Sequence, residues 1–240
     1  MSRFGVGALA PTLLVVGLVW AGVGTTLASA GLRNDTQLYL RVVTACRAGG
    51  EACQKASVAA VDAARHQEGL GSLKLPSMFW SLPYDQQTLI VVDEERVSRR
   101  LRPLTGVTAA LNNSSLLAAQ EGTDPMYSGR ADWGANQGIA PNVVFADFEY
   151  MYDDGLGSGN ADCTSAHPQG CWGHRGNILY RWPRVGGWRL QLGAACTTDY
   201  AEPQGFPELI CTILFVDGPS RGGYVYTWAR ARRSTKPAMS

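Results

Sequence analysis

The chain has little charge and little histidine. Asp, Glu, Lys and Arg make up 17% of its 240 residues, against about 25% in an average soluble protein. Twenty-one basic and 20 acidic residues leave a net charge of +1. No positive field gathers phosphates, so we expect no nucleic-acid partner. The chain has three histidines, and a zinc site with three histidine ligands would need all of them.

Several catalytic and nucleotide-binding motifs are also missing. The sequence has no P-loop, no HExxH, no CxxC pair and no GxGxxG at a strand–helix junction. Gly218-Pro219-Ser220-Arg221-Gly222 matches the G-x-S-x-G nucleophile elbow. That elbow requires a following helix and a later catalytic histidine, whereas all three histidines precede it here. We therefore interpret this segment as a turn.

An export signal is predicted at the amino terminus. No charged residue occurs between Arg3 and Arg33, and the strongest apolar run is Leu13 to Val23. Ala28-Ser29-Ala30 matches the small-residue pattern of a cleavage site. Residues 1–30 are thus predicted to be a signal peptide, with an uncleaved anchor that tethers the chain to a membrane through residues 5–30 as the alternative. Both readings predict a secreted, extracellular or cell-envelope protein.

Cysteine usage agrees with export, because all six cysteines follow residue 30. They are Cys46, Cys53, Cys163, Cys171, Cys196 and Cys211. Six cysteines allow 15 connectivities, but the spacing favours the sequential one. Two pairs close short loops, and the third pair lies in two strand-like runs that are expected to be neighbours. We predict the disulfides 46–53, 163–171 and 196–211.

Hydrophobic periodicity predicts helices first and strands last, which indicates an α+β fold with helices packed on an antiparallel sheet. Residues 31–83 are predicted to be a helical extension and linker, with a helical pair over 36–66. Further helices are predicted over 85–100, 108–122 and 143–152, with a short helical turn over 174–180. Strands are predicted over 188–194, 210–216 and 224–228. Loops are predicted over 123–142 and 153–173, and 229–240 is predicted to be a solvated basic tail.

Two segments carry polar residues suited to a site. Residues 153–162 combine Asp153, Asp154 and Asp162 with three glycines, a composition that fits either calcium ligation or a solvated turn. The other segment places His174 at the start of a short helix, where unpaired backbone N–H groups disfavour a charged imidazolium. A neutral ligand or hydrogen-bonding role is predicted for this histidine.

The segment Gly173-His174-Arg175-Gly176-Asn177-Ile178-Leu179 resembles the GHRxNIL signature of the bacterial CAP superfamily, the SCP-like extracellular domain. Asp93-Glu94-Glu95-Arg96 followed by Leu101-Arg102-Pro103-Leu104 is similar to the first helix of that family. Weaker likenesses are Ala118-Ala119 in the second helix and Val185-Gly186-Gly187-Trp188 before the closing sheet. The run from Tyr150 to Gly155 and the run from Gly170 to Arg175 are similar to an actinobacterial secreted branch. The resemblance covers residues 84–217.

The resemblance implies a three-layer α-β-α sandwich with a small sheet, formed here by a CAP-like domain over 84–228, and a central cleft. In the family this cleft often holds two histidines and two acidic residues that take a divalent cation. His174 corresponds to the second histidine. Asp153 is the first choice for an acid, since Tyr150-x-x-Asp153 stands where the family has Trp-x-x-Glu, with Asp154 and Glu149 as rivals.

This chain departs from the family pattern at the other positions. Gly134-Ala135-Asn136 replaces the family's Gly-Glu-Asn, so one carboxylate is lost. No histidine lies between the second helix and Trp133, and Asp124 is the candidate substitute for it. Asp93 replaces the usual asparagine. One histidine with one or two carboxylates makes a poor tetrahedral zinc site.

We therefore predict a secreted or surface-tethered, non-catalytic CAP-like protein whose degenerate cleft binds a small or lipid ligand or a divalent cation, with no cofactor required. The metal ligands would be His174 and Asp153. The alternatives are a cell-wall or peptide hydrolase using His174 with Asp153 or Asp154, and a structural envelope or adhesion protein. The predicted cleft residues are His174, Asp153, Asp154, Glu149, Asn136, Trp133 and Trp172, with Tyr150 and Tyr152 as further exposed aromatics.

Overall fold

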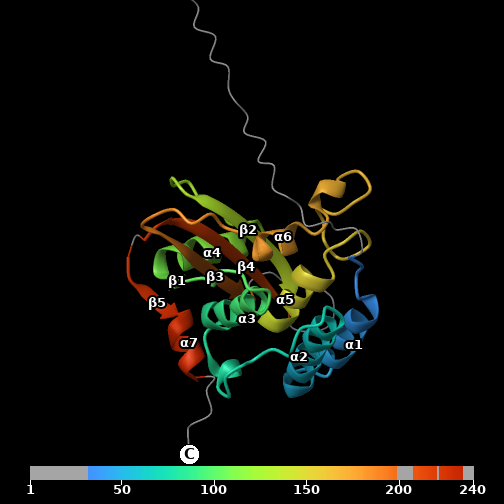
Figure 1. Cartoon of the computed structure of the whole chain (residues 1–240). Coiled ribbons are helices and arrows are strands. Elements are labelled where there is room, and N and C mark those ends of the chain that lie inside the picture. Colours follow the sequence, from blue (N-terminus) through green and yellow to red (C-terminus); the bar gives the residue numbers. More distant parts are fainter. Residues whose placement is uncertain (1–31, 199–207, 221, 235–240) are drawn as a thin grey trace, which may run out of the picture. The chain divides into compact units, whose positions relative to one another are not determined.

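Figure 1 shows the computed structural model of the chain, which describes residues 32–198, 208–220 and 222–234. The predicted signal peptide or anchor over 1–30 lies outside these residues. The helices are α1 (Thr36–Cys46), α2 (Gly50–Gln67), α3 (Tyr84–Ser98), α4 (Ala109–Glu121), α5 (Val143–Tyr152), α6 (Gly173–Leu179) and α7 (Trp228–Ser234), with short 3-10 turns at Phe79–Ser81 and Pro168–Gly170. The strands are β1 (Gly106–Thr108), β2 (Asp132–Ala140), β3 (Trp188–Thr197), β4 (Leu209–Pro219) and β5 (Tyr224–Thr227).

The five strands form one mixed sheet in the order β2-β4-β3-β1-β5. The expectation of an antiparallel sheet is corrected at one position, because β1 runs parallel to β3, with Gly106 opposite Gln191. The strand β1 has three residues, so it is too short to show the alternation that reveals a strand in sequence. The fold is therefore mixed α/β.

The strand β2 corrects the predicted loop over 123–142. It pairs with β4 along its whole length, from Asp132 opposite Asp217 to Ala140 opposite Leu209. The two glycines of this strand, Gly134 and Gly138, obscured it in the sequence, and each lies close to a side chain of another element. A Cβ at Gly138 would lie 2.9 Å from the Tyr150 ring. Glycine within a strand often marks such a close approach.

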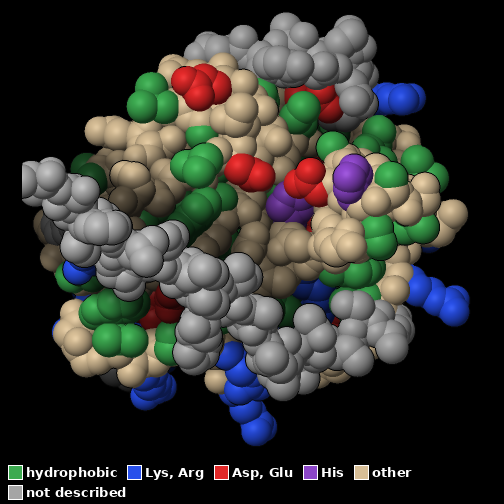
Figure 2. Space-filling model, turned by 90° about the horizontal axis from the view of Figure 1, so that it is seen from above, with side chains coloured by type: hydrophobic (Ala, Val, Ile, Leu, Met, Phe, Trp, Pro, Cys, Tyr) green, Lys and Arg blue, Asp and Glu red, His purple; other side chains and the backbone are tan. Residues whose placement is uncertain are grey.

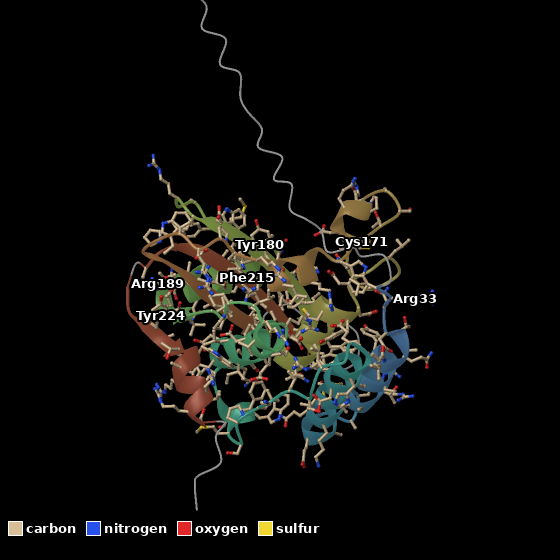
Figure 3. The ribbon with its side chains drawn as sticks, viewed as in Figure 1. Arg33, Cys171, Tyr180, Arg189, Phe215 and Tyr224 are labelled. Carbon is tan, nitrogen blue, oxygen red and sulfur yellow. A yellow bond between two sulfur atoms is a disulfide. The ribbon has the colours of Figure 1, made fainter. Side chains whose placement is uncertain are left out.

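Side chains of β4 alternate between the two faces of the sheet. Leu214 and Val216 pack with Leu111 of α4, whereas Ile213 and Phe215 belong to the main core, which includes α3 and α5. Figure 3 marks Phe215 within this core; its ring lies 6.4 Å from that of Trp182. Because both faces of β4 are apolar, the strand is buried on both sides.

The N-terminal extension belongs to the same compact unit as the sheet, since residues 32–240 cluster together by contacts. The helix α2 packs along α5. The helix α2 also contacts α3: Arg65 Nη1 of α2 lies 2.9 Å from Glu95 Oε1 of α3, and both side chains are almost fully buried. A buried ion pair of this kind requires its partners to stay in register, so it aligns the extension with α3.

The first residues of the predicted solvated tail form a helix, and of residues 229–234 only Ala231 is buried. Trp228 to Ser234 form α7, which contacts α3 and buries Trp228 and Ala231. The arginines of this segment lie on the outer side of the helix: Arg230 and Arg233 are exposed. The segment looked polar in sequence because Trp228 and Ala231 are the residues that this helix buries.

The three predicted disulfides are confirmed: Cys46–Cys53, Cys163–Cys171 and Cys196–Cys211. The last bond joins directly opposed residues of β3 and β4. Three disulfides indicate an oxidising environment, as expected for an extracellular protein. Among the helices of the described residues, none has the length and apolarity needed to cross a membrane.

Candidate functional site

The short helix α6 places His174 next to a long loop, residues 153–173. The loop is closed on itself by the Cys163–Cys171 disulfide and is followed by Trp172, which adopts a left-handed conformation with φ of 61°. Figure 3 shows Cys171 on the same side as Arg33, where the chain enters α1. There Asn34 accepts a hydrogen bond from the Gly155 N–H and donates one to the Gly155 carbonyl. The loop is therefore held by its own disulfide and by the hydrogen bonds with Asn34.

Polar side chains hold α6 at both ends. Asn136 of β2 donates to the His174 carbonyl at 3.1 Å, and Asn177 donates to the Ala135 carbonyl at 2.7 Å. At the other end, Arg96 of α3 donates to the carbonyls of Ile178 and Tyr180. A seven-residue helix has too few internal hydrogen bonds to be stable alone, so these contacts hold the histidine in position.

The imidazole of His174 contacts a buried carboxylate. His174 Nδ1 lies 2.7 Å from Asp154 Oδ1, and the side chains are 16% and 0% exposed. Asp154 also accepts hydrogen bonds from Asn160 Nδ2 at 2.6 Å and from the Arg175 N–H at 3.3 Å. A carboxylate with several donors has a fixed orientation, and it fixes the ring of the histidine in turn. The ring of Tyr150 packs 5.2 Å from the imidazole, centroid to centroid.

This pair borders an open cleft of about 280 Å³. The wall consists of residues from α1, β2, α5, α6, the 153–173 loop and the segments beside them: Tyr39, Asp124, Gln137, Gly138, Ile139, Phe145, Glu149, Tyr150, Asp153, Asp154, Gly159, Asn160, Ala161, Asp162, His174 and Glu208. Figure 2 shows acidic side chains gathered beside histidine on this face. Six carboxylates and one imidazole face the cleft, with no Lys or Arg among its described lining residues.

Three carboxylates of the cleft, Asp124, Glu149 and Asp153, hold their protons more tightly than usual. Burial and the nearby Asp35 and Asp154 raise the pKa of Asp153 to about 6. Burial, followed by the charges of Asp153 and Glu208, raises the pKa of Glu149 well above its ordinary value. Desolvation also raises the pKa of Asp124, while the nearby His174 lowers it. Each added negative charge in this cleft is therefore unfavourable.

The predicted cleft residues divide into two groups. His174, Asp153, Asp154 and Glu149 all line the cleft. The carboxylate that contacts His174 is Asp154 rather than Asp153, the first choice from the resemblance. Asn136 is fully buried beneath α6 and acts through the His174 backbone.

Of the four predicted aromatic residues, Tyr150 lines the cleft, and Trp133 is exposed outside it. Trp133 and Trp172 are absent from the lining of the cleft. Tyr150 and Tyr152 are 1% and 5% exposed, which corrects their predicted exposure. The hydroxyl of Tyr150 donates to the Cys211 carbonyl at 2.9 Å, so this side chain links the cleft wall to the sheet.

Sequence reasoning missed the cleft residues of two elements. Tyr39 comes from α1, in the extension that the family resemblance leaves out. Gln137, Gly138 and Ile139 come from β2, which the glycine-rich sequence disguised. No local signal identifies Tyr39, whose place depends on long-range packing. Recognition of β2 as a strand would have brought its three residues to the cleft.

A buried charged network lies behind the cleft and was also missed. Glu95 contacts Arg65, Arg99 and the Tyr152 hydroxyl. Glu68 of the extension extends the network to Arg99 and Arg175. Because Arg175 belongs to α6, the network joins the extension to the helix that carries His174.

The donor set does not fit the metal centre implied by the resemblance. Within the described part of the chain, no group of three or more His, Cys, Asp or Glu side chains is arranged to hold a metal ion. Asp154 already accepts hydrogen bonds from Asn160 and Arg175 and contacts His174 Nδ1. Zinc sites normally use three or four protein ligands, so His174 and Asp153 alone are too few to form one.

Comparisons of the chain with protein-family models, with curated proteins and with solved structures found no match.

Proposed function

We propose that this chain is an extracellular CAP-like protein, with the three-layer α-β-α arrangement of that family, and that its cleft binds a small ligand. The proposal takes the family from the motif around His174 and the extracellular location from the three disulfides. The observation that carries the binding function is the His174–Asp154 pair, which is held in place at the edge of an open cleft.

The composition of the cleft favours binding over catalysis. Its described lining residues include no Ser, Thr, Cys or Lys, so the side-chain nucleophiles present are carboxylates, tyrosines and the imidazole of His174. They also include no arginine to stabilise a developing oxyanion. A pair such as His174–Asp154 still provides directional hydrogen bonds, which small-molecule sites use to orient a ligand.

The size and charge of the cleft favour a small polar ligand over a lipid. Its volume of about 280 Å³ is at the lower end of the roughly 300–1,000 Å³ typical of drug-sized sites. Its six carboxylates repel the head groups of anionic lipids and fatty acids. The wall mixes polar and aromatic side chains, so a compact hydrogen-bonding molecule fits it best.

A ligand-observed NMR screen of cationic, neutral and anionic small molecules tests this proposal. The matched variants are Ala161→Trp, which places a large ring at the cleft wall, and Leu117→Trp, on the exposed surface of α4. We expect at least one compound class to bind to wild type and to Leu117→Trp but not to Ala161→Trp. The proposal is overturned if no compound shows this pattern.

Hydrolysis is a second candidate, favoured by the 2.7 Å contact between His174 Nδ1 and Asp154 Oδ1. A carboxylate that orients a histidine supports its action as a general base toward water. The test is hydrolysis of casein and of peptidoglycan by wild type, His174→Ala and the control His66→Ala. Activity lost only in His174→Ala supports the candidate, and activity that is absent in wild type or unchanged in His174→Ala excludes it for these substrates.

A structural envelope or adhesion protein is the third candidate. It is favoured because the described part of the N-terminal extension, residues 32–83, packs against the cleft. Asn34 binds the 153–173 loop and Tyr39 forms part of the cleft wall. A purely structural protein would show none of the Ala161-dependent binding described above. The same screen therefore separates this candidate from ligand binding.

A further inference from the structure

We infer that the ligand of this cleft carries an organic ammonium group. This inference rests on the proposed binding function and specifies the chemical class of the ligand. The first observation is the one-sided charge of the wall: six carboxylates from four regions of the chain face the same space, without a Lys or Arg among the described lining residues.

The second observation is a buried carboxylate that has no hydrogen-bond partner. Asp153 is 6% exposed and lines the cleft. Its Oδ1 atom is buried and accepts no hydrogen bond within the described residues. Leaving such an atom without a partner costs free energy, and an N–H donor of a bound ligand would remove that cost. Asp153 thus differs from Asp154, which already has its donors.

The third observation separates an organic cation from a metal ion. Aromatic rings form the apolar part of the wall, with the rings of Tyr39 and Phe145 5.4 Å apart, centroid to centroid. Aromatic faces attract ammonium groups through the ring quadrupole and supply no ligand to Ca²⁺ or Mg²⁺. The described residues also contain no cluster of donors arranged for a metal ion. Carboxylates beside aromatic rings are the combination that suits an amine.

The raised pKa values of Asp153 and Glu149 agree with this assignment. Both reflect burial together with the repulsion of neighbouring carboxylates. A positive charge between these groups would offset that repulsion. An anionic ligand would add to it.

Isothermal titration calorimetry with cadaverine, a five-carbon diamine, tests the inference directly. The neutral comparison is 1,5-pentanediol, which has the same chain length, and calcium chloride supplies a divalent metal alone. We expect cadaverine to bind at least tenfold more tightly than either. Asp153→Asn should weaken cadaverine binding about tenfold, whereas Asp132→Asn on the exposed part of β2 should leave it unchanged. Tyr39→Leu should weaken it severalfold, with the exposed Tyr84→Leu as its control.

The inference is overturned by equal binding of the diol, by unchanged binding to Asp153→Asn, or by calcium binding that exceeds that of cadaverine and depends on Asp153. Circular dichroism of each variant excludes loss of folding as the cause of weak binding. If neutral or anionic compounds bind in the Ala161-dependent manner and cadaverine does not, this inference fails and the proposed binding function stands. If no compound binds in that manner, both fail.

Discussion

Asp154 and His174 are 20 residues apart in the chain, yet Asp154 Oδ1 lies 2.7 Å from His174 Nδ1. The loop between them is closed by the Cys163–Cys171 disulfide and tied to Asp154 through Asn160. One carboxylate thereby connects the beginning of the loop, its interior and the helix that follows it. The geometry of the cleft depends on this connection.

Replacing Asp154 should destabilise the protein. Asp154→Ala removes the acceptor for Asn160 and for the Arg175 N–H, and the contact with His174 Nδ1. We expect the free energy of unfolding to fall by about 2–3 kcal/mol, since hydrogen bonds to a buried charged group are lost and their donors remain. Urea denaturation followed by circular dichroism measures this change. Asp132→Ala, at an exposed position, is the control, and equal losses in the two variants would refute the assigned role.

Glu95 should matter far more to stability than an exposed glutamate in a similar pair. Glu95 is fully buried against Arg65 and Arg99, so Glu95→Gln leaves two cations without their buried counter-charge. We expect a loss of about 3 kcal/mol in the free energy of unfolding. Glu51→Gln breaks the exposed Glu51–Lys55 pair and should produce no measurable change. Similar effects of the two substitutions would contradict the network.

Two short disulfides should have equal effects on stability and different effects on binding. The sequence separations are 7 for Cys46–Cys53 and 8 for Cys163–Cys171, so the chain-entropy model predicts a loss of about 2–3 kcal/mol on removing either one. Paired Cys→Ala variants test this by thermal and urea unfolding. Removing Cys163–Cys171 should also weaken ligand binding severalfold, because that bond closes the loop of the cleft. Binding that is lost equally in both variants would point to a global effect instead.

The pH dependence of stability should report on Asp153. Its pKa is about 6 in the native protein, against about 3.9 in an unfolded chain. The native state therefore holds this proton to higher pH, and the contribution of Asp153 to stability falls as the pH rises from about 4 to 6. Asp153→Asn should raise the free energy of unfolding on the order of 1 kcal/mol at pH 7.5, a value reduced from the full shift because the carboxyl borders an open cleft.

At pH 3.5 the same substitution should have little effect, because Asp153 is then protonated in both states. Urea unfolding at the two pH values measures the difference. A gain that is the same at both values would show that removal of the charge is not its cause.

Patterns that are local in sequence predicted much of this fold. The helix over 143–152 has the predicted bounds. Its mostly apolar residues form one stretch of sequence, with the polar residues Asn142 and Asp153 directly on either side. Pairing of the cysteines followed from short spacings and from two strands that proved to be adjacent. In each case the residues that allowed the prediction lie within about 20 positions of one another in the chain.

Features that depend on distant partners were not predictable in this way. The glycines of β2 meet Tyr150 and Asn177, so their small size serves contacts that no local pattern displays. Tyr39 reaches the cleft because α1 packs on α2, which packs along α5, and its ring contacts that of Phe145. Of the candidate site, His174 and its acidic neighbours were found because they lie in one stretch of chain, and the facing wall was not.

The most direct test of the account is NMR observation of the three histidine rings while compounds that bind the cleft are added. His174 lines the cleft, whereas His66 lies on α2 beside Ser72 and His167 lies in the disulfide-closed loop. The account predicts that the ring signals of His174 shift with saturation while those of His66 stay fixed. Binding that leaves the His174 signals unchanged, or shifts both histidines equally, would contradict the central claim that this cleft is the ligand site.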